Sequence, residues 1–234
     1  MIEITRIKAI TLDLDDTLWP IWPTIAEAEL RLQEWLLDRA PRTAALFADT
    51  HARVELREQA QTDWPQKHHD LSFMRREMIR LGLKQSGEDQ DLAGPAFGVF
   101  FAARQQVRLF DDAVPALALL AARWPVLALS NGNADVHLVG IGAYFCGTVS
   151  AREVGVGKPD ARIFQSAAQA LQLAPEQILH VGDDEHLDVL GALDVGMQTA
   201  WLNRSDSLWT LPAQPHATVA SMLELCDLLG LLAA

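Results

Sequence analysis

The sequence predicts an α/β protein: a parallel sheet whose chain is interrupted by a large helical insertion. Three observations predict it. Short apolar, β-branched runs alternate with helical patterns over the second half of the chain, as they do when strands are joined by crossover helices. The stretch from about residue 20 to residue 108 has helical patterns and no convincing strand. Polar residues follow the apolar runs, where ligands bind in open parallel sheets.

Four apolar runs are the predicted strands, each bounded by Gly, Asn or Asp. They are residues 7–12 (Ile-Lys-Ala-Ile-Thr-Leu), 126–130 (Val-Leu-Ala-Leu-Ser), 178–181 (Ile-Leu-His-Val) and 198–202. Amphipathic helical patterns lie between or before them, at 114–122, 162–171 and 186–194.

The insertion directly follows the first predicted strand. Its helical segments are residues 25–37, 43–61, 71–81 and 89–106, with breakers at Pro41, Pro65 and Gly87. We therefore expect a core built from residues 1–18 and 109–234, and an all-helical domain from 19 to 108. Its position after the first strand predicts a lid over the end of that strand.

Composition limits the classes of partner. The formal net charge is −12, so the surface repels nucleic acid and anionic membranes, and neither is an expected partner. No apolar run reaches the length of about 18 residues that a membrane span needs. The charged N-terminus is unlike a secretory signal, and Cys146 and Cys226 lack a metal or redox spacing. We expect a cytoplasmic protein with both cysteines buried; its oligomeric state stays open.

Polar segments end the predicted strands or open helices. Each alone is typical of a turn, a loop, a helix start or a cap. Together, in this order, they supply the groups needed for metal-assisted phosphoryl transfer. They are Asp13-Leu14-Asp15-Asp16-Thr17, Ser130-Asn131-Gly132-Asn133, Gly157-Lys158-Pro159, and Gly182-Asp183-Asp184 with Asp188 beyond.

These segments resemble the haloacid dehalogenase superfamily. The run from Ala9 to Leu18 is similar to the first motif of that family. Ser130-Asn131, Lys158-Pro159 and Gly182-Asp183-Asp184-x-x-x-Asp188 are similar to the second, third and fourth. The resemblance covers essentially the whole chain. It implies a Rossmann-like parallel sheet core with an inserted all-helical cap domain, and an active site between the two.

A closer resemblance is to the bacterial flavin mononucleotide phosphatases, which also act on the ribitylaminouracil phosphate of riboflavin synthesis. It rests on Ser130-Asn131-Gly132-Asn133-Ala134, on 179–184 (Leu-His-Val-Gly-Asp-Asp) and on 196–201 (Gly-Met-Gln-Thr-Ala-Trp). The similar cap stretch His69-Asp70-Leu71-Ser72 is less specific. The resemblance implies a small phosphorylated metabolite as the substrate.

The residue types indicate a mechanism. Asp13 is the predicted nucleophile, because a carboxylate needs no base to form an aspartyl-phosphate. Asp15 is the predicted general acid for the leaving group and then the base for water. Acidic groups beside a phosphate dianion require a cation, and Mg²⁺ prefers oxygen ligands. Asp13 and Asp183 are its predicted side-chain ligands; by resemblance, Asp15 adds its backbone carbonyl.

The remaining site residues have binding or supporting roles. Lys158 and the Ser130 hydroxyl are predicted to hold the phosphate oxygens. Asp188 is expected to position Lys158 or the metal shell, and Asp184 to be a neighbour of the ligands. Thr17 braces the loop and, with Asn131 and Trp19, is placed on the substrate side. For Trp19 and Trp22 packing is favoured over stacking on a substrate ring, and His180 is expected to be a satisfied core residue.

Three rival functions remain. A receiver domain also forms an aspartyl-phosphate, but it lacks an insertion of this length. A haloalkanoate dehalogenase has no alkoxide to protonate, and the presence of Asp15 argues against that chemistry. A catalytically idle binding protein is disfavoured because every expected catalytic group is present.

Overall fold

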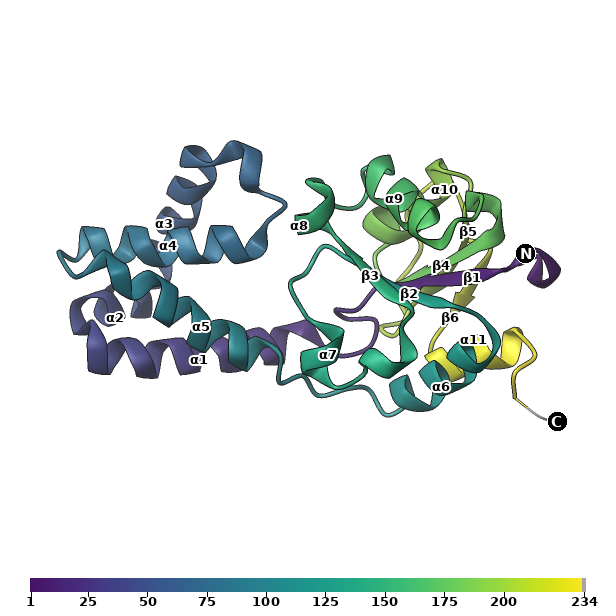
Figure 1. Cartoon of the computed structure of the whole chain (residues 1–234), viewed down its shortest axis with the longest axis horizontal. Coiled ribbons are helices and arrows are strands. Elements are labelled where there is room, and N and C mark those ends of the chain that lie inside the picture. Colours follow the sequence, from purple (N-terminus) through teal and green to yellow (C-terminus); the bar gives the residue numbers. More distant parts are fainter. Residues whose placement is uncertain (233–234) are drawn as a thin grey trace. The chain divides into compact units, whose positions relative to one another are not determined.

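The computed structural model describes residues 1–232, and the chain forms two compact units. The core unit comprises Met1–Pro20 and the chain from Arg108 onward, and the helical unit comprises Ile21–Val107. In Figure 1 the strands of the described residues belong to the core unit. The α/β fold predicted from the sequence is confirmed.

The core unit is built on one six-stranded sheet with the strand order β3-β2-β1-β4-β5-β6, and every pairing is parallel. The strands are β1 Ala9–Leu12, β2 Val126–Ser130, β3 Gly147–Ser150, β4 Ile178–Gly182, β5 Gln198–Leu202 and β6 Ala217–Val219. The four strands predicted from apolar runs are β1, β2, β4 and β5. All of their residues are buried, as expected for parallel strands covered on both faces.

The edge strands β3 and β6 were not predicted. Only Val149 in β3 and Val219 in β6 are buried, so neither strand has the apolar run that reveals a central strand. An edge strand has one neighbour and exposes part of its surface, which removes that signal. The structure therefore adds one strand at each side of the predicted sheet.

Helices cover both faces of this sheet. Figure 1 shows α9 and α10 on one face and α6 and α11 on the other. The helices of the core unit are α6 Ala113–Arg123, α7 Val136–Val139, α8 Ala151–Val154, α9 Ala161–Leu171, α10 Gly191–Asp194 and α11 Met222–Leu228. Short 3₁₀ turns are η1 Ile4–Arg6, η4 Gly142–Tyr144 and η5 Pro175–Gln177.

The predicted helix at 186–194 is in fact two segments. Glu185–Leu190 forms a π-helical turn, η6, and α10 continues from Gly191. The Asp184 side chain caps η6 by accepting from the backbone N–H groups of His186 and Leu187. Turns of this kind are frequent at functional sites, and this one carries Asp188.

The helical unit has its own apolar core. Its helices are α1 Ile21–Arg39, α2 Pro41–Ala48, α3 Thr50–Asp63, α4 Leu71–Gln85 and α5 Ala93–Arg104, with 3₁₀ turns η2 Pro65–Lys67 and η3 Gln90–Leu92. Buried residues from all five helices form one cluster, including Leu32, Phe47, Ile79 and Phe100. The pattern at 43–61 predicted one helix, but Asp49 separates α2 from α3. Its side chain caps α3 by accepting from the backbone of His51 and Ala52.

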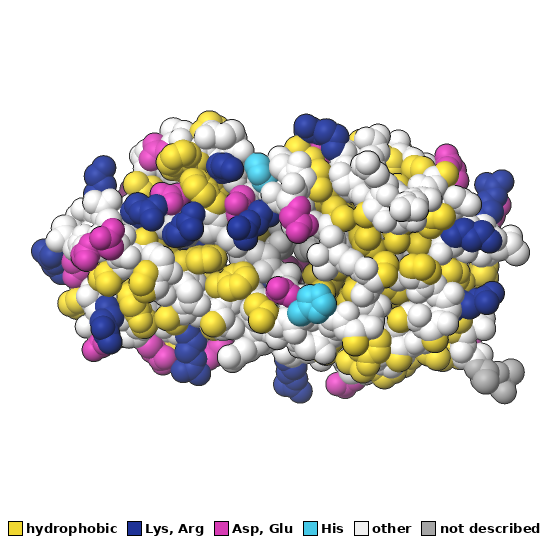
Figure 2. Space-filling model, viewed as in Figure 1, with side chains coloured by type: hydrophobic (Ala, Val, Ile, Leu, Met, Phe, Trp, Pro, Cys, Tyr) yellow, Lys and Arg dark blue, Asp and Glu magenta, His cyan; other side chains and the backbone are white. Residues whose placement is uncertain are grey.

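Surface properties agree only partly with expectation. Cys226 is buried, but Cys146 is exposed, so the expectation that both cysteines are buried was wrong for Cys146. Cys146 immediately precedes the edge strand β3, where one side lacks a neighbour. Among the described residues no helix is both long enough and apolar enough to cross a membrane. Figure 2 shows acidic and basic side chains interspersed on the visible face.

Candidate active site

The site lies where the strand order of the sheet reverses, between β1 and β4. The chain runs outward through β2 and β3 on one side of β1 and then returns to β4 on the other side. Ligands bind at such a switch point, outside the carboxyl ends of the strands. Asp13 follows β1 and Asp183 follows β4, and the Asp13 N–H donates to the carbonyl of Val181 at 2.9 Å. The two carboxylates therefore flank the switch point.

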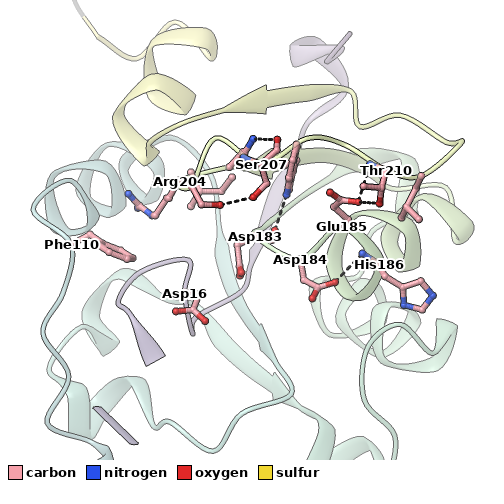
Figure 3. Close-up of a pocket in the computed structure, with 14 residues that line it drawn as sticks. Asp16, Phe110, Asp183, Asp184, Glu185, His186, Arg204, Ser207 and Thr210 are labelled. Carbon is pink, nitrogen blue, oxygen red and sulfur yellow. Dashed lines mark hydrogen bonds between the residues drawn. The ribbon is translucent and has the colours of Figure 1, made fainter. Parts of the chain in front are cut away.

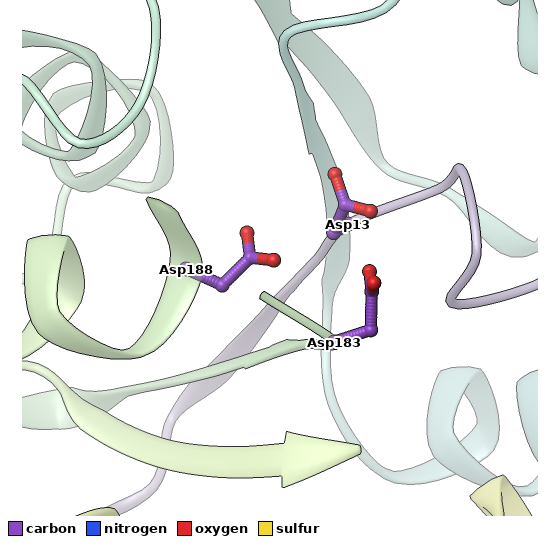
Figure 4. Close-up of side chains that lie close together, drawn as sticks. All are labelled: Asp13, Asp183 and Asp188. Carbon is purple, nitrogen blue, oxygen red and sulfur yellow. The ribbon is translucent and has the colours of Figure 1, made fainter. Parts of the chain in front are cut away.

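Three carboxylates converge there (Figure 4). Asp13, Asp183 and Asp188 each offer an oxygen within 4.8 Å of those of the other two. Asp13 and Asp188 are buried, and Asp183 is half-buried. Acidic groups so close and so poorly hydrated repel one another, so the cluster needs positive charge.

Lys158 supplies part of that charge. Its Nζ donates to Asp13 Oδ1 and to Asp188 Oδ1, both at 2.5 Å, and the lysine is 6% exposed. Burial alone would lower the lysine pKa, but the two carboxylates outweigh it and raise the pKa. Lys158 is therefore a fixed ammonium between the predicted nucleophile and Asp188.

Both carboxylate oxygens of Asp188 accept hydrogen bonds. Its Oδ1 accepts from Lys158 and from His180 Nε2, and its Oδ2 accepts from the backbone N–H of Asp184 at 3.1 Å. Burial would raise the Asp188 pKa, but Lys158 and His180 lower it. A carboxylate whose two oxygens are engaged in this way suits the predicted role of positioning Lys158.

Gly182 makes this arrangement possible. A Cβ at that position would lie 2.2 Å from the Asp188 carboxyl carbon, so only glycine leaves room for the side chain. The Gly182-Asp183 pair thus serves two purposes: the glycine admits Asp188, and the next residue presents its own carboxylate.

His180 connects Asp188 to the strand beside it. The ring is buried, and burial lowers its pKa, so the imidazole is neutral. A carboxylate only accepts, so Nε2 carries the hydrogen and donates to Asp188, and Nδ1 accepts from the hydroxyl of Thr11 at 2.9 Å. The expectation that His180 is a satisfied core residue is confirmed. Its link to Lys158 through Asp188 was not predicted.

Asn131 and Ser130 arrange the other side of Lys158. Asn131 accepts from the Lys158 N–H at 2.7 Å and donates to the Lys158 carbonyl at 2.9 Å. Both ends of its amide therefore hold the lysine backbone, which favours positioning over substrate contact. The Ser130 oxygen accepts from the Gly132 N–H at 2.9 Å, so its own hydrogen can be donated to a phosphate oxygen.

Asp183 also requires a nearby cation. Burial, followed by repulsion from Asp188 and Asp16, raises its pKa to about 7. Burial also raises the pKa of Asp13, where Lys158 opposes the effect. Asp13 therefore needs nearby positive charge to be ionised as a nucleophile. The sequence predicted a cation from charge repulsion, but it did not predict this effect of burial. With one ammonium for three carboxylates, the ionised cluster has a charge of about −2, and oxygen donors of this kind fit Mg²⁺.

The loop after Asp13 contains the predicted acid and two bracing residues. Asp15 is half-buried, and its Oδ1 accepts from the indole N–H of Trp19 at 2.8 Å. Trp19 has no exposed surface, which favours the packing role over stacking on substrate. The buried Thr17 hydroxyl donates to Asp183 Oδ1 at 3.2 Å, as expected of a residue that braces the loop.

Two residues near the site were not predicted as site residues, although Trp201 ends the stretch 196–201 that supports the family resemblance. The Arg204 guanidinium donates to the Thr17 carbonyl and pairs with Asp112, and the Trp201 indole donates to the Asp183 carbonyl at 2.7 Å. Both line a pocket of about 660 Å³ together with Asp16, Phe110 and Asp183 (Figure 3). A pattern of local residues cannot identify such partners, because Arg204 and Thr17 are 187 residues apart.

The raised pKa of Asp183 predicts a measurable effect of Mg²⁺ on stability. The folded pKa of about 7 lies above the unfolded value of about 3.9, so the stability that this group contributes falls as pH rises from about 4 to 7. Bound Mg²⁺ should offset that loss. We expect Mg²⁺ to raise the Tm by on the order of 5 °C at pH 8, and by less at pH 5.5.

The matching variant is Asp183→Asn. In EDTA at pH 8 it should unfold at a higher temperature than the wild type, because a neutral amide replaces a buried charge, and Mg²⁺ should no longer raise its Tm. The exposed Asp206 is a control: Asp206→Asn should retain the wild-type response. An Asp183→Asn protein with the full Mg²⁺ response would remove Asp183 from the metal site.

The chain is similar to known proteins in sequence and in fold. Residues 7–196 match the family described as haloacid dehalogenase-like hydrolase. The chain is 30% identical to the 5-amino-6-(5-phospho-D-ribitylamino)uracil phosphatase YigB of Escherichia coli, over 96% of this chain and 97% of that protein. It is 30% identical to a phosphoserine phosphatase of Thermus thermophilus, over 93% of this chain and 97% of that protein. A solved structure titled 2-haloacid dehalogenase, from Pseudomonas syringae pv. Tomato DC3000, superposes with a TM-score of 0.91 at 33% identity and covers 96% of this chain and 98% of its own.

Proposed function

Because the chain belongs to the haloacid dehalogenase-like hydrolases, we propose that this phosphoric monoester hydrolase depends on Mg²⁺ and acts through an aspartyl-phosphate on Asp13. The observation that carries the proposal is the buried ammonium of Lys158, 2.5 Å from both Asp13 and Asp188, with Asp183 beside them. The substrate is a small phosphorylated metabolite.

Each site residue has a chemical role that follows from its position. An Asp13 oxygen bonds to phosphorus while the ester P–O bond breaks, and its electron pair goes to the leaving oxygen. Lys158 and the Ser130 hydroxyl hold the phosphate oxygens on which charge accumulates. Mg²⁺, held by the carboxylates of Asp13 and Asp183 and by the Asp15 carbonyl, would supply the positive charge that lets a dianionic ester approach.

Asp15 acts as the general acid and then as the general base. It gives a proton to the leaving alkoxide, and its carboxylate then takes one from the water that attacks the aspartyl-phosphate. Inorganic phosphate leaves and Asp13 is regenerated. Hydrolysis, rather than storage of the phosphoryl group, depends on this second role.

The substrate assignment rests on two supports. The similarity to YigB extends over nearly the whole chain, and the sequence resembles flavin mononucleotide phosphatases around Asn131 and Asp183. We propose flavin mononucleotide or 5-amino-6-(5-phospho-D-ribitylamino)uracil as preferred substrates, and we assign their selection to the helical unit acting as a cap.

The test is a substrate ranking with and without metal. Purified protein should hydrolyse flavin mononucleotide or the uracil compound with a kcat/KM at least about tenfold above that for ribose 5-phosphate, phosphoserine and simple nucleotides. Activity should vanish in EDTA and return with Mg²⁺. A preference for a simple sugar phosphate would overturn the substrate assignment alone, whereas full activity after exhaustive EDTA treatment would overturn the metal requirement.

A dehalogenase is the second candidate, favoured by the similarity to the solved structure titled 2-haloacid dehalogenase. Asp15 opposes it, because halide departure needs no proton donor. The same assay with 2-chloropropionate separates the two: halide release without phosphate release would replace the phosphatase proposal.

A further inference from the structure

The loop that follows the nucleophile closes on itself through Trp19. Asp15 and Trp19 form an isolated β-bridge, and the Asp16 N–H donates to the Trp19 carbonyl at 2.7 Å. Asp16 adopts a left-handed backbone with φ of 58°, which an aspartate tolerates better than most residues, and the Leu18 N–H bonds the Leu14 carbonyl at 2.8 Å. This backbone brings the Trp19 side chain back to Asp15.

The Trp19 indole is fixed more firmly than the carboxyl group it meets. The tryptophan is fully buried, whereas Asp15 is half-buried, and the Nε1–Oδ1 distance is 2.8 Å. A buried ring cannot change rotamer without disturbing its neighbours, so it restrains the more exposed partner. Trp19 therefore limits the orientations that the Asp15 carboxyl group can take.

The indole N–H also distinguishes the two oxygens of the Asp15 carboxyl group. An indole N–H only donates, so Oδ1 must accept whether Asp15 is ionised or protonated. In a protonated carboxyl group the carbonyl oxygen is the better acceptor, so this contact favours the proton on Oδ2. We propose that Trp19 is a positioning residue for the general acid: its indole N–H orients Asp15 so that Oδ2 delivers the proton to the leaving group.

This inference rests on the proposed function, because it takes Asp15 as the acid. It goes further by assigning a positioning role to Trp19, for which the sequence analysis considered only packing and substrate contact. The expected consequence is selective: loss of the indole N–H matters where the leaving group needs a proton, and little where it does not.

The test compares two esters of similar shape. Trp19→Phe removes the donor and keeps a ring. It should lower kcat/KM for phenyl phosphate on the order of 10- to 100-fold, but lower that for 4-nitrophenyl phosphate by less than about threefold, because 4-nitrophenolate leaves without protonation. The parameter kcat/KM reports the step in which the leaving group departs, so hydrolysis of the intermediate does not obscure the comparison.

The chain offers a matched control. Trp124 is also buried, and its indole N–H donates to the Ile7 carbonyl at 3.1 Å, away from the catalytic groups. Trp124→Phe should leave the ratio of the two esters unchanged. If Trp19→Phe lowers both esters equally, the positioning role is overturned while the phosphatase stands. A wild type that hydrolyses neither these esters nor flavin mononucleotide nor the ribitylaminouracil phosphate would instead overturn the proposed function.

A second readout tests whether Trp19 acts through Asp15. In an Asp15→Asn background, Trp19→Phe should change kcat/KM for phenyl phosphate by less than about twofold, and additive losses would contradict the proposal. If Trp19→Phe does not fold, ¹⁵N-labelled protein provides the answer. Of the indole N–H resonances from its seven tryptophans, one should move distinctly in Asp15→Ala. An unchanged set would overturn the contact.

Discussion

Asp13→Asn should reduce turnover by on the order of 10⁴-fold or more while the protein stays folded. An amide oxygen cannot form the aspartyl-phosphate, so the first chemical step is lost. The fold should tolerate the change because burial raises the pKa of Asp13, which means that its ionised form is a cost at neutral pH. Lys158 would keep its contact with Asp188. We therefore expect an unchanged or slightly higher Tm at pH 8.

The measurement is phosphate release together with trapping of the covalent intermediate. Acid-quenched wild-type protein should carry a hydroxylamine-sensitive phosphate, and Asp13→Asn should carry none. Asp206→Asn, an exposed carboxylate in a backbone that asparagine also tolerates, is the control and should behave as wild type. Turnover by Asp13→Asn at the wild-type rate would show that another group attacks.

Lys158→Met should abolish activity and also destabilise the protein. The variant loses a charged donor to the phosphate, which is expected to cost on the order of 10³-fold in kcat/KM. It also leaves Asp13 and Asp188 buried without their shared ammonium. Breaking a buried pair in this way costs about 3–5 kcal/mol.

The destabilisation should depend on pH in a definite direction. Without Lys158 the folded pKa values of Asp13 and Asp188 lie above their unfolded values. The stability that these groups contribute is then full at acid pH and is lost as pH rises. The Tm deficit of Lys158→Met relative to wild type should thus be larger at pH 8 than at pH 5. Lys8→Met, at an exposed lysine of the same unit, should show no deficit at either pH. A pH-independent deficit would indicate a packing defect instead.

The sequence alone determined the central strands and the residues that follow them. Strands β1, β2, β4 and β5 are continuous apolar runs because parallel strands in mid-sheet are buried on both faces. Asp13, Ser130 and Asp183 could be placed at one edge of the sheet because the carboxyl ends of parallel strands share an edge. Local pattern suffices where burial and strand direction decide the outcome.

Only the tertiary structure decided which of these side chains meet and in what state. Asp13 and Lys158 are 145 residues apart, and their contact depends on the strand reversal between β1 and β4. The link from Thr11 through His180 to Asp188 crosses from one strand to its neighbour, so it depends on the pairing of Thr11 with His180. The raised pKa values of Asp13 and Asp183 follow from burial beside other carboxylates, and no local pattern encodes that burial. Sequence patterns identify which groups are present, but desolvation and long-range contacts, which set their charge and orientation, exist only once the chain has folded.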